Sequence, residues 1–290
     1  MDPFDRVAIV GVGLLGGSLA KVMRKLGLAK SLVGHGRNEA NLEEAKSLGI
    51  IDHVALNMQS AVKDADLIVL CSPVRTASQL IAKVAPQIKP GCLITDVGSV
   101  KEPLVREIEA LITKDVFFVG AHPIAGSEKS GFHVSSDTLF QGARCIVTPT
   151  DKTEPSALKQ IMELWKGVGM HVSTMDVKEH DFIFGAVSHL PHVLIFALMN
   201  TVGDLKSDNY DEITSFSGDG LKDITRIAGG EPVMWRDICI SNKGSVLHCL
   251  DRFQEKLNYI RSCIEQENGE LLSQEFENAN KHRLNLIGNA

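Results

Sequence analysis

Short apolar runs alternate with longer segments of helical periodicity along the first 174 residues. Between most of the runs lie amphipathic stretches, such as Leu14–Leu26 and Asn41–Leu48. This alternation predicts a parallel sheet with helices on both faces, that is, a doubly wound α/β domain over residues 1–174. The runs expected to form its strands are Val7–Val10, Ser31–Gly34, Leu67–Cys71, Leu93–Val97, Val116–Val119, Cys145–Thr148 and His171–Thr174.

From about Met175 the pattern changes, because strand-like runs disappear and long helical periodicities replace them. The segment Phe182–Val202 is apolar almost all round, which predicts a helix buried on every side. Amphipathic helices are expected over Val246–Glu267 and Leu271–Leu286. We therefore predict an all-helical dimerisation domain over residues 175–290. A helix that needs cover on all sides, in a domain this small, favours a core shared by two subunits of a homodimer.

Composition narrows the class of protein. The 290 residues are 44% hydrophobic and 23% charged, as in ordinary globular domains. A net charge of −6 and 5% aromatic residues disfavour nucleic-acid binding. The segment Phe182–Val202 contains His189, Pro191, His192 and Asn200, so a buried helix is favoured over a membrane span. A small-molecule substrate is expected, with neither nucleic acid nor membrane as a partner.

Cysteine usage and the first residues predict a reducing compartment. The six cysteines, at positions 71, 92, 145, 239, 249 and 263, form no C-x-x-C pair. The opening Met1–Arg6 is polar, so no secretory signal is expected. We predict a cytoplasmic protein with reduced thiols in its core.

A glycine-rich turn follows the first predicted strand and opens a helix. The sequence Gly11-Val12-Gly13-Leu14-Leu15-Gly16 matches G-x-G-x-x-G in the context that a dinucleotide site requires. Gly11 permits the tight turn, Gly13 lets a pyrophosphate approach, and Gly16 lets helix and strand pack closely. The free N–H groups of the helix N-terminus then face the phosphates. This predicts a Rossmann-type domain that binds NAD or NADP.

The end of the second strand bears on the choice of cofactor. Enzymes that use NAD usually carry an acidic residue about 20 residues after the glycines, where it binds the ribose 2′-hydroxyl. Here Gly36 stands near that place and Arg37 follows it. A small residue beside an arginine suits a 2′-phosphate, so NADP is favoured over NAD. The alternative is that Arg37 is a solvated loop residue.

Polar clusters follow three later strands, at the edge where ligands bind in open α/β sheets. The third is dense in hydrogen-bonding groups, as a rigid substrate loop would be. Its His122 is a candidate catalyst, although a single histidine at a strand end is more often a loop residue. The clusters are Cys71-Ser72-Pro73, Asp96–Lys101 and Ala121–Gly131.

Two features of the helical region also bear chemistry. His189 and His192 lie three residues apart and share a helix face. No H-E-x-x-H motif or third ligand accompanies them, so no metal is expected; they either bond to Ser188 and the backbone or line a cleft. Arg226 either pairs with Asp223 or clamps a substrate carboxylate.

These motifs together resemble the prephenate dehydrogenase family, which includes arogenate and cyclohexadienyl dehydrogenases. The resemblance covers nearly the whole chain. It rests on G-x-G-L-L-G-G-S-L, D-V-G-S-V-K, H-P-I-A-G-S-E-K-S-G, S-H-L-P-H, D-I-T-R-I-A and P-V-M-W-R-D-I. It implies oxidative decarboxylation of prephenate, or of arogenate, with hydride transfer to NAD(P)+ in tyrosine biosynthesis.

The resemblance also assigns roles to individual residues. His122 matches the catalytic histidine and Ser99 a serine that orients it. Gly36 departs from the acid of NAD-specific members. The matched substrate residues are Ser127, Glu128, His192, Arg226 and Trp235, and the cofactor residues predicted from the turn and the strand ends are Gly11, Gly13, Leu14, Leu15, Gly16, Gly36, Arg37, Ser72 and Pro73. Many relatives carry a regulatory domain or a fused mutase, and neither is expected here.

Two other classes of protein fit part of the pattern. A β-hydroxyacid dehydrogenase or imine reductase would share the two-domain plan but would leave S-H-L-P-H unexplained. A dinucleotide-sensing regulatory protein would need neither His122 nor Arg226.

Overall fold

A computed structural model describes residues 2–113, 115–127, 129–208, 210 and 212–288. The contacts between residues divide the chain into two compact units, Met1–Lys243 and Gly244–Ala290. The first unit therefore contains the sheet and also the helices that directly follow it. The functional boundary predicted between residues 174 and 175 stays a prediction.

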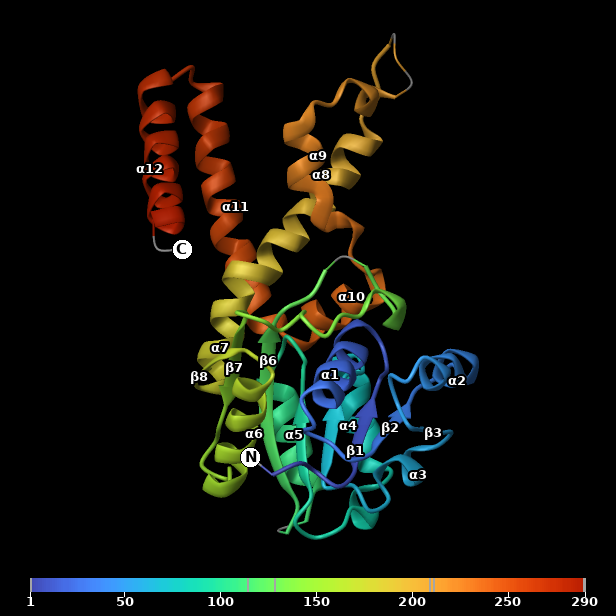
Figure 1. The fold of residues 1–290 in the computed structure, drawn as a ribbon. Coiled ribbons are helices and arrows are strands. Elements are labelled where there is room, and N and C mark those ends of the chain that lie inside the picture. Colours follow the sequence, from blue (N-terminus) through green and yellow to red (C-terminus); the bar gives the residue numbers. More distant parts are fainter. Residues whose placement is uncertain (1, 114, 128, 209, 211, 289–290) are drawn as a thin grey trace. The chain divides into compact units, whose positions relative to one another are not determined.

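One eight-stranded sheet forms the centre of the first unit, in the order β3-β2-β1-β4-β5-β6-β7-β8 (Figure 1). All neighbouring strands are parallel except β6 and β7. The predicted α/β class is confirmed, while the antiparallel pair and the short β3 are departures from the predicted parallel sheet. The strands are β1 (Val7–Val10), β2 (Leu32–His35), β3 (His53–Ala55), β4 (Leu67–Leu70), β5 (Leu93–Asp96), β6 (Phe117–Ile124), β7 (Arg144–Thr148) and β8 (His171–Thr174).

Helices cover both faces of this sheet, because its central strands are apolar on both sides. In β1, Val7 and Ile9 belong to one apolar cluster and Ala8 and Val10 to the other. The first cluster takes side chains from α1 and α6, and the second takes them from α3, α4 and α5. The bounds of these helices are α1 (Leu14–Lys25), α2 (Glu39–Ser47), α3 (Met58–Val62), α4 (Val74–Ala82), α5 (Glu102–Leu111) and α6 (Pro155–Gly167).

Strand β6 runs further than its apolar core predicts. Its pairing with β5 ends at Thr95 and Val119, but Gly120–Ile124 continue as partners of β7 alone. His122 therefore lies inside a strand rather than in the loop after it, and beyond the carboxyl end of β5. This places its side chain on a rigid element at the edge of the sheet where ligands bind.

The helical part of the first unit begins with a long apolar run, Val177–Asp204, which by length and composition alone could cross a membrane. Of the 18 residues that form its most apolar part, only 17% are buried, so the predicted burial on every side is wrong for the single chain. In α8, for example, Ile195 is the one buried residue, because the short neighbouring elements touch only part of its surface. The elements are α7 (Val177–Phe184), a π-helical turn (Gly185–His189), α8 (Leu190–Asp204), α9 (Asp219–Thr225) and α10 (Pro232–Ser241).

The second unit is a hairpin of two helices, α11 (Lys243–Glu265) and α12 (Gly269–Gly288). Their turn includes Glu267 at φ +52°, a left-handed conformation that ends the first helix. An ion pair of 2.9 Å joins Lys256 of α11 to Glu275 of α12. Both helices agree with the predicted ones to within a few residues.

Candidate active site

The glycine turn between β1 and α1 is built for close approach of an anion. Gly11 has φ +105°, and a Cβ there would lie 2.6 Å from the Cys71 carbonyl oxygen. A Cβ on Gly16 would lie 2.2 Å from the Gly11 oxygen, whereas one on Gly13 would meet no atom of the described residues within 4 Å. Gly11 and Gly16 are thus required by the turn itself, and Gly13 leaves open space at the start of α1. No side chain caps this helix and no acidic residue lies in its first turn, which suits a pyrophosphate.

The turn after β4 lies against these glycines. The backbone nitrogen of Ser72 would be 3.0 Å from a Cβ on Gly11. The Ser72 Oγ atom is buried and has no hydrogen-bond partner among the described residues. An orphaned hydroxyl beside the glycine turn fits a bound polar group. Together with the exposed Pro73 and with Leu14 and Leu15 at the start of α1, these residues fit a dinucleotide.

Gly36 and Arg37 follow β2, which is the neighbour of β1. The Gly11 N–H donates to the His35 carbonyl over 2.8 Å, so this strand end is tied to the glycine turn. Among the described residues, a Cβ on Gly36 would meet only Leu42, at 3.7 Å, so the position has room for a side chain. Arg37 is exposed, and within the described part of the chain it makes no hydrogen bond or ion pair.

His122 is the first of three buried polar side chains that hydrogen bonds join in series. Its Nδ1 lies 2.9 Å from Nε2 of His180, whose Nδ1 lies 2.8 Å from Oδ1 of Asp181. The Phe184 ring packs 4.6 Å from the His122 ring. Burial, followed by the nearby His180, Lys101 and His189, holds the pKa of His122 well below its ordinary value. His122 is therefore neutral at physiological pH and able to accept a proton.

Asp181 also fixes the start of α5 from outside that helix. Its Oδ1 accepts from the Lys101 N–H at 2.7 Å and its Oδ2 from the Glu102 N–H at 2.9 Å. Lys101 occupies the N-cap position, and its own side chain makes no cap hydrogen bond there. The carboxylate thus satisfies two N–H groups that a helix leaves unpaired at its first turn.

A buried ion pair between Asp96 of β5 and Lys101, at the start of α5, is hydrogen-bonded to Ala121 of β6, the residue before His122. The Lys101 ammonium contacts Asp96 Oδ2 and donates to the Ala121 carbonyl at 2.8 Å. Asp96 in turn accepts from the Ala121 N–H at 3.1 Å and from the Gly98 N–H at 2.7 Å. Both charges are almost wholly buried, and the added hydrogen bonds compensate for their desolvation. The pair fixes the backbone that precedes His122.

The other predicted residues near β5 and β6 are less constrained. Ser99 is half-buried, and its backbone opposes the burial that lowers the pKa of His189. Ser127 is exposed on the loop after β6, where its Oγ accepts from the Lys129 N–H at 3.2 Å. Glu128 lies outside the described residues.

A second polar group surrounds the π-helical turn. Asn242 donates to the Asp181 carbonyl at 2.6 Å and lies 3.0 Å from His189 Nδ1. His189 Nε2 is buried and has no partner among the described residues, and burial lowers the pKa of this histidine to about 4. An unpartnered buried nitrogen beside His122 fits contact with a bound polar ligand.

His192, Trp235 and Arg226 come together on the same side of the helical region. The His192 and Trp235 rings stack with centroids 3.6 Å apart, and His192 Nδ1 is 2.9 Å from the Ser188 carbonyl. Burial lowers the pKa of His192, and the Arg226 charge lowers it further. Arg226 is exposed and opens a 3-10 turn after α9 rather than lying within an apolar helix.

Sequence reasoning missed His180, Asp181 and Asn242. Asp176 caps the helix that carries the first two, accepting from the N–H groups of Lys178 and Glu179. An N-cap aspartate followed by adjacent histidine and aspartate, just before an apolar run, was the available signal. Their contacts with other elements join positions 53 to 80 residues apart, so no local pattern reveals them.

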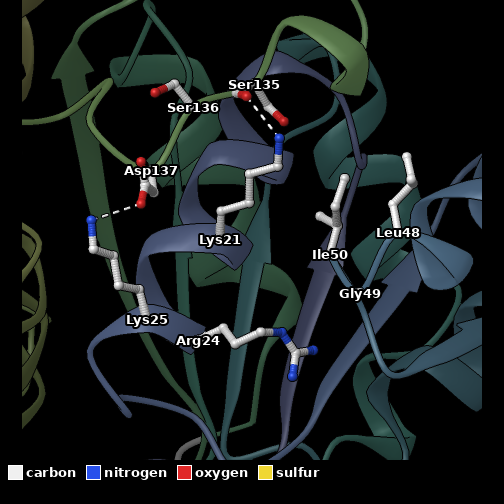
Figure 2. A pocket seen from close by; sticks show the side chains of 9 residues that line it. All are labelled: Lys21, Arg24, Lys25, Leu48, Gly49, Ile50, Ser135, Ser136 and Asp137. Carbon is white, nitrogen blue, oxygen red and sulfur yellow. Dashed lines mark hydrogen bonds and ion pairs between the residues drawn. The ribbon is translucent and has the colours of Figure 1, made fainter.

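A separate pocket of about 440 Å³ lies at the C-terminal half of α1 (Figure 2). Its cations are already neutralised or bonded: Lys21 donates to the Ser135 carbonyl and Lys25 pairs with Asp137. Arg24 pairs with Asp52, which is outside the pocket. The pocket contains none of the residues predicted for cofactor or substrate, so it is not the candidate active site.

Comparisons with known proteins cover nearly the whole chain. A family model described as the prephenate dehydrogenase nucleotide-binding domain matches residues 19–174, and one described as the dimerization domain matches residues 176–278. Prephenate dehydrogenase of Bacillus subtilis is 35% identical over 96% of this chain and 75% of its own length. Cyclohexadienyl dehydrogenase of Zymomonas mobilis is 32% identical over 99% and 97%.

A solved structure agrees with these matches. Prephenate dehydrogenase from A. aeolicus, in complex with hydroxyphenyl propionate and NAD+, has a TM-score of 0.90 and 38% identity, covering 97% of this chain and 98% of that one. The predicted family is confirmed along both parts of the sequence. The chain belongs to the prephenate dehydrogenase family.

Proposed function

We propose that this chain oxidises and decarboxylates prephenate to 4-hydroxyphenylpyruvate with NAD(P)+, a step toward tyrosine. One observation carries the proposal: in a chain of this family, a neutral His122, with one ring nitrogen bonded to no described residue, lies beyond β5, at the edge of the sheet that also bears the glycine turn. Neither a β-hydroxyacid dehydrogenase nor a regulatory protein accounts for that histidine and its buried partners.

The residues would divide the reaction as follows. The bound dinucleotide supplies the hydride acceptor. His122 accepts the proton of the substrate ring hydroxyl as that carbon becomes a carbonyl carbon, a role suited to a neutral imidazole. Arg226 holds a substrate carboxylate, with Ser99, Ser127, His192 and Trp235 around the ring and side chain. The ring carboxylate leaves as CO2 and the ring becomes aromatic, which makes the step effectively irreversible.

We also propose NADP as the favoured cofactor, by a modest margin. Gly36 carries no negative charge to repel a 2′-phosphate, and the adjacent Arg37 has no other partner among the described residues. The argument is electrostatic and concerns one exposed contact, so it predicts a preference rather than strict specificity.

Three further proposals concern the whole chain. Residues 1–174 bind the dinucleotide, and residues 175–290 contribute to substrate binding and dimerisation. The enzyme is a homodimer, because the apolar run Val177–Asp204 is largely exposed in the single chain. It works in the cytoplasm, since all six cysteines are free thiols and four are buried.

The test is a steady-state assay of reduced cofactor at 340 nm, with prephenate and arogenate each offered with NAD+ and NADP+. We expect 4-hydroxyphenylpyruvate and CO2 from prephenate. His122→Asn should lower kcat by roughly 10²-fold or more, because general-base catalysis contributes about 10²–10⁴-fold. Cofactor affinity should stay unchanged. Folded wild-type protein inactive on both substrates would overturn the proposal, and a loss below tenfold would remove His122 from the base role.

A further inference from the structure

We propose that His180 and Asp181 are positioning residues that hold His122 with its proton on Nδ1, leaving the Nε2 lone pair as the base. The inference deepens the proposed function, on which its kinetic part rests. It starts from the direction in which each hydrogen bond of the buried chain must run.

Asp181 sets that direction, because its oxygens are already engaged as acceptors. Oδ1 accepts from the Lys101 N–H and Oδ2 from the Glu102 N–H, and backbone N–H groups can only donate. An ionised carboxylate has no proton to offer His180. The 2.8 Å contact between Asp181 Oδ1 and His180 Nδ1 therefore requires the proton to be on Nδ1 of His180.

The tautomer of His180 then decides that of His122. A neutral imidazole carries one proton, so His180 Nε2 is an acceptor once Nδ1 is protonated. The 2.9 Å contact with His122 must be donated by His122 Nδ1. His122 Nε2 is left bare, and it has no hydrogen-bond partner among the described residues.

The surroundings of the three hydrogen-bonded side chains keep the His122 and His180 rings neutral. Burial, and after it the Lys101 charge, opposes protonation of His122 and His180, and both pKa values lie below the ordinary one. Asp181 and Asp96 act in the opposite sense on His180, but burial has the largest effect.

A purely structural role would also explain the contacts, because they join α7 to β6. Two substitutions of His180 separate the roles. In His180→Gln the amide oxygen can take the place of Nε2 and accept from His122, although the Asp181 contact is lost. In His180→Asn the amide nitrogen can take the place of Nδ1 and donate to Asp181, although nothing then accepts from His122.

The experiment combines NMR of the free enzyme with kinetics. In protein labelled with ¹⁵N-histidine, the His122 signals are identified by their loss in His122→Asn. In wild type and in His180→Gln, we expect His122 to carry its proton on Nδ1 and none on Nε2. In His180→Asn, we expect this tautomer not to be maintained. With prephenate, His180→Asn should lower kcat at least tenfold with KM unchanged, while His180→Gln should stay within about threefold, since loss of the reactive tautomer costs orders of magnitude in other histidine bases.

A wild-type His122 protonated on Nε2 would overturn the inference, as would equal kcat values for the two His180 variants. The NMR measurement needs no substrate, so it tests the tautomer independently of the reaction. Inactivity on prephenate combined with the expected tautomer would reject the proposed function while leaving the chain of hydrogen bonds established.

Discussion

The proposed preference for NADP over NAD rests on two adjacent residues, Gly36 and Arg37. A carboxylate near Gly36 would bind a ribose 2′-hydroxyl and repel a 2′-phosphate, whereas Arg37 can pair with the phosphate. Gly36 has room for a side chain, since in the described part of the chain a Cβ there meets only Leu42, at 3.7 Å. A substitution at this position can therefore change the charge without forcing the turn to move.

We expect Gly36→Asp to shift the ratio of kcat/KM toward NAD+, and Arg37→Ala to weaken NADP+ more than NAD+. Gly36→Asn is the matched control, because it adds the same bulk without the charge. Each change of charge should alter the ratio by up to about fivefold, because an exposed ion pair screened by salt contributes up to about 1 kcal/mol. If the wild-type enzyme uses NAD+ at least tenfold better than NADP+, Arg37 is only a solvated loop residue.

The residues that sequence alone could place are those whose function shows in local spacing. Gly11, Gly13 and Gly16 follow from the turn they must make, and His122 from its motif. His180 and Asp181 could not be placed in this way. Their meaning depends on α7 packing beside β6 and α5, and the contacts that create it join residues 58 to 80 positions apart.

At the scale of the element, two glycines of the turn between β1 and α1 differ in whether the fold requires them. Gly16 is needed for packing, because its Cβ would lie 2.2 Å from backbone, and backbone cannot rotate away. Gly13 has a negative φ, and a Cβ there would meet no described atom within 4 Å, so the turn itself does not require glycine at this position.

Gly16→Ala should therefore affect the stability of the fold, whereas Gly13→Ala should affect dinucleotide binding. We expect Gly16→Ala to lower the melting temperature by several degrees, since overpacking costs about 1–3 kcal/mol. Gly13→Ala should melt within a degree or two of wild type but bind the dinucleotide at least several-fold more weakly by calorimetry. Unchanged dinucleotide affinity in Gly13→Ala would show that the pyrophosphate does not approach this turn.

Helices and strands with a strong hydrophobic period could be predicted from the sequence. Which other elements cover them was harder to predict. β1 and β8 have the predicted bounds, and α1 and α12 agree within a few residues. β6 was predicted too short, because Gly120–Ile124 contains Gly and Pro and pairs with a strand that only the fold brings beside it. For Phe182–Val202 the period indicated a helix correctly, but a sequence cannot state how much of it the same chain covers.

At the scale of the whole molecule, the exposed apolar run Val177–Asp204 argues for a second copy of the chain. Val187 is 66% exposed in the single chain, and a contiguous exposed apolar surface of this kind marks an interaction site. We expect sedimentation to find a dimer at micromolar concentration. Val187→Glu should shift it toward monomer, whereas Leu56→Glu, at a residue 62% exposed outside the run, should not. A monomeric wild type would contradict the dimer.

The buried histidines of the first unit should make stability depend on pH. His122, His180 and His189 have pKa values lowered by burial, that of His189 to about 4. The unfolded chain binds their protons near pH 6.5, while the folded chain does not, so the unfolded state gains protons as the pH falls. Their contribution to stability is complete above pH 6.5 and is lost progressively as the pH falls through the folded values.

We therefore expect the free energy of unfolding to fall between pH 7.5 and pH 5.5 in urea titrations at one protein concentration. Each histidine contributes at most about 1.4 kcal/mol per pH unit. The carboxylates with lowered pKa, such as Asp52 and Asp66, act only below about pH 4, so this window isolates the histidines. His189→Gln removes one titrating group and should flatten the slope even if it lowers stability throughout. Stability that stays constant or rises on acidification to pH 5.5 would mean that these rings are charged in the folded protein.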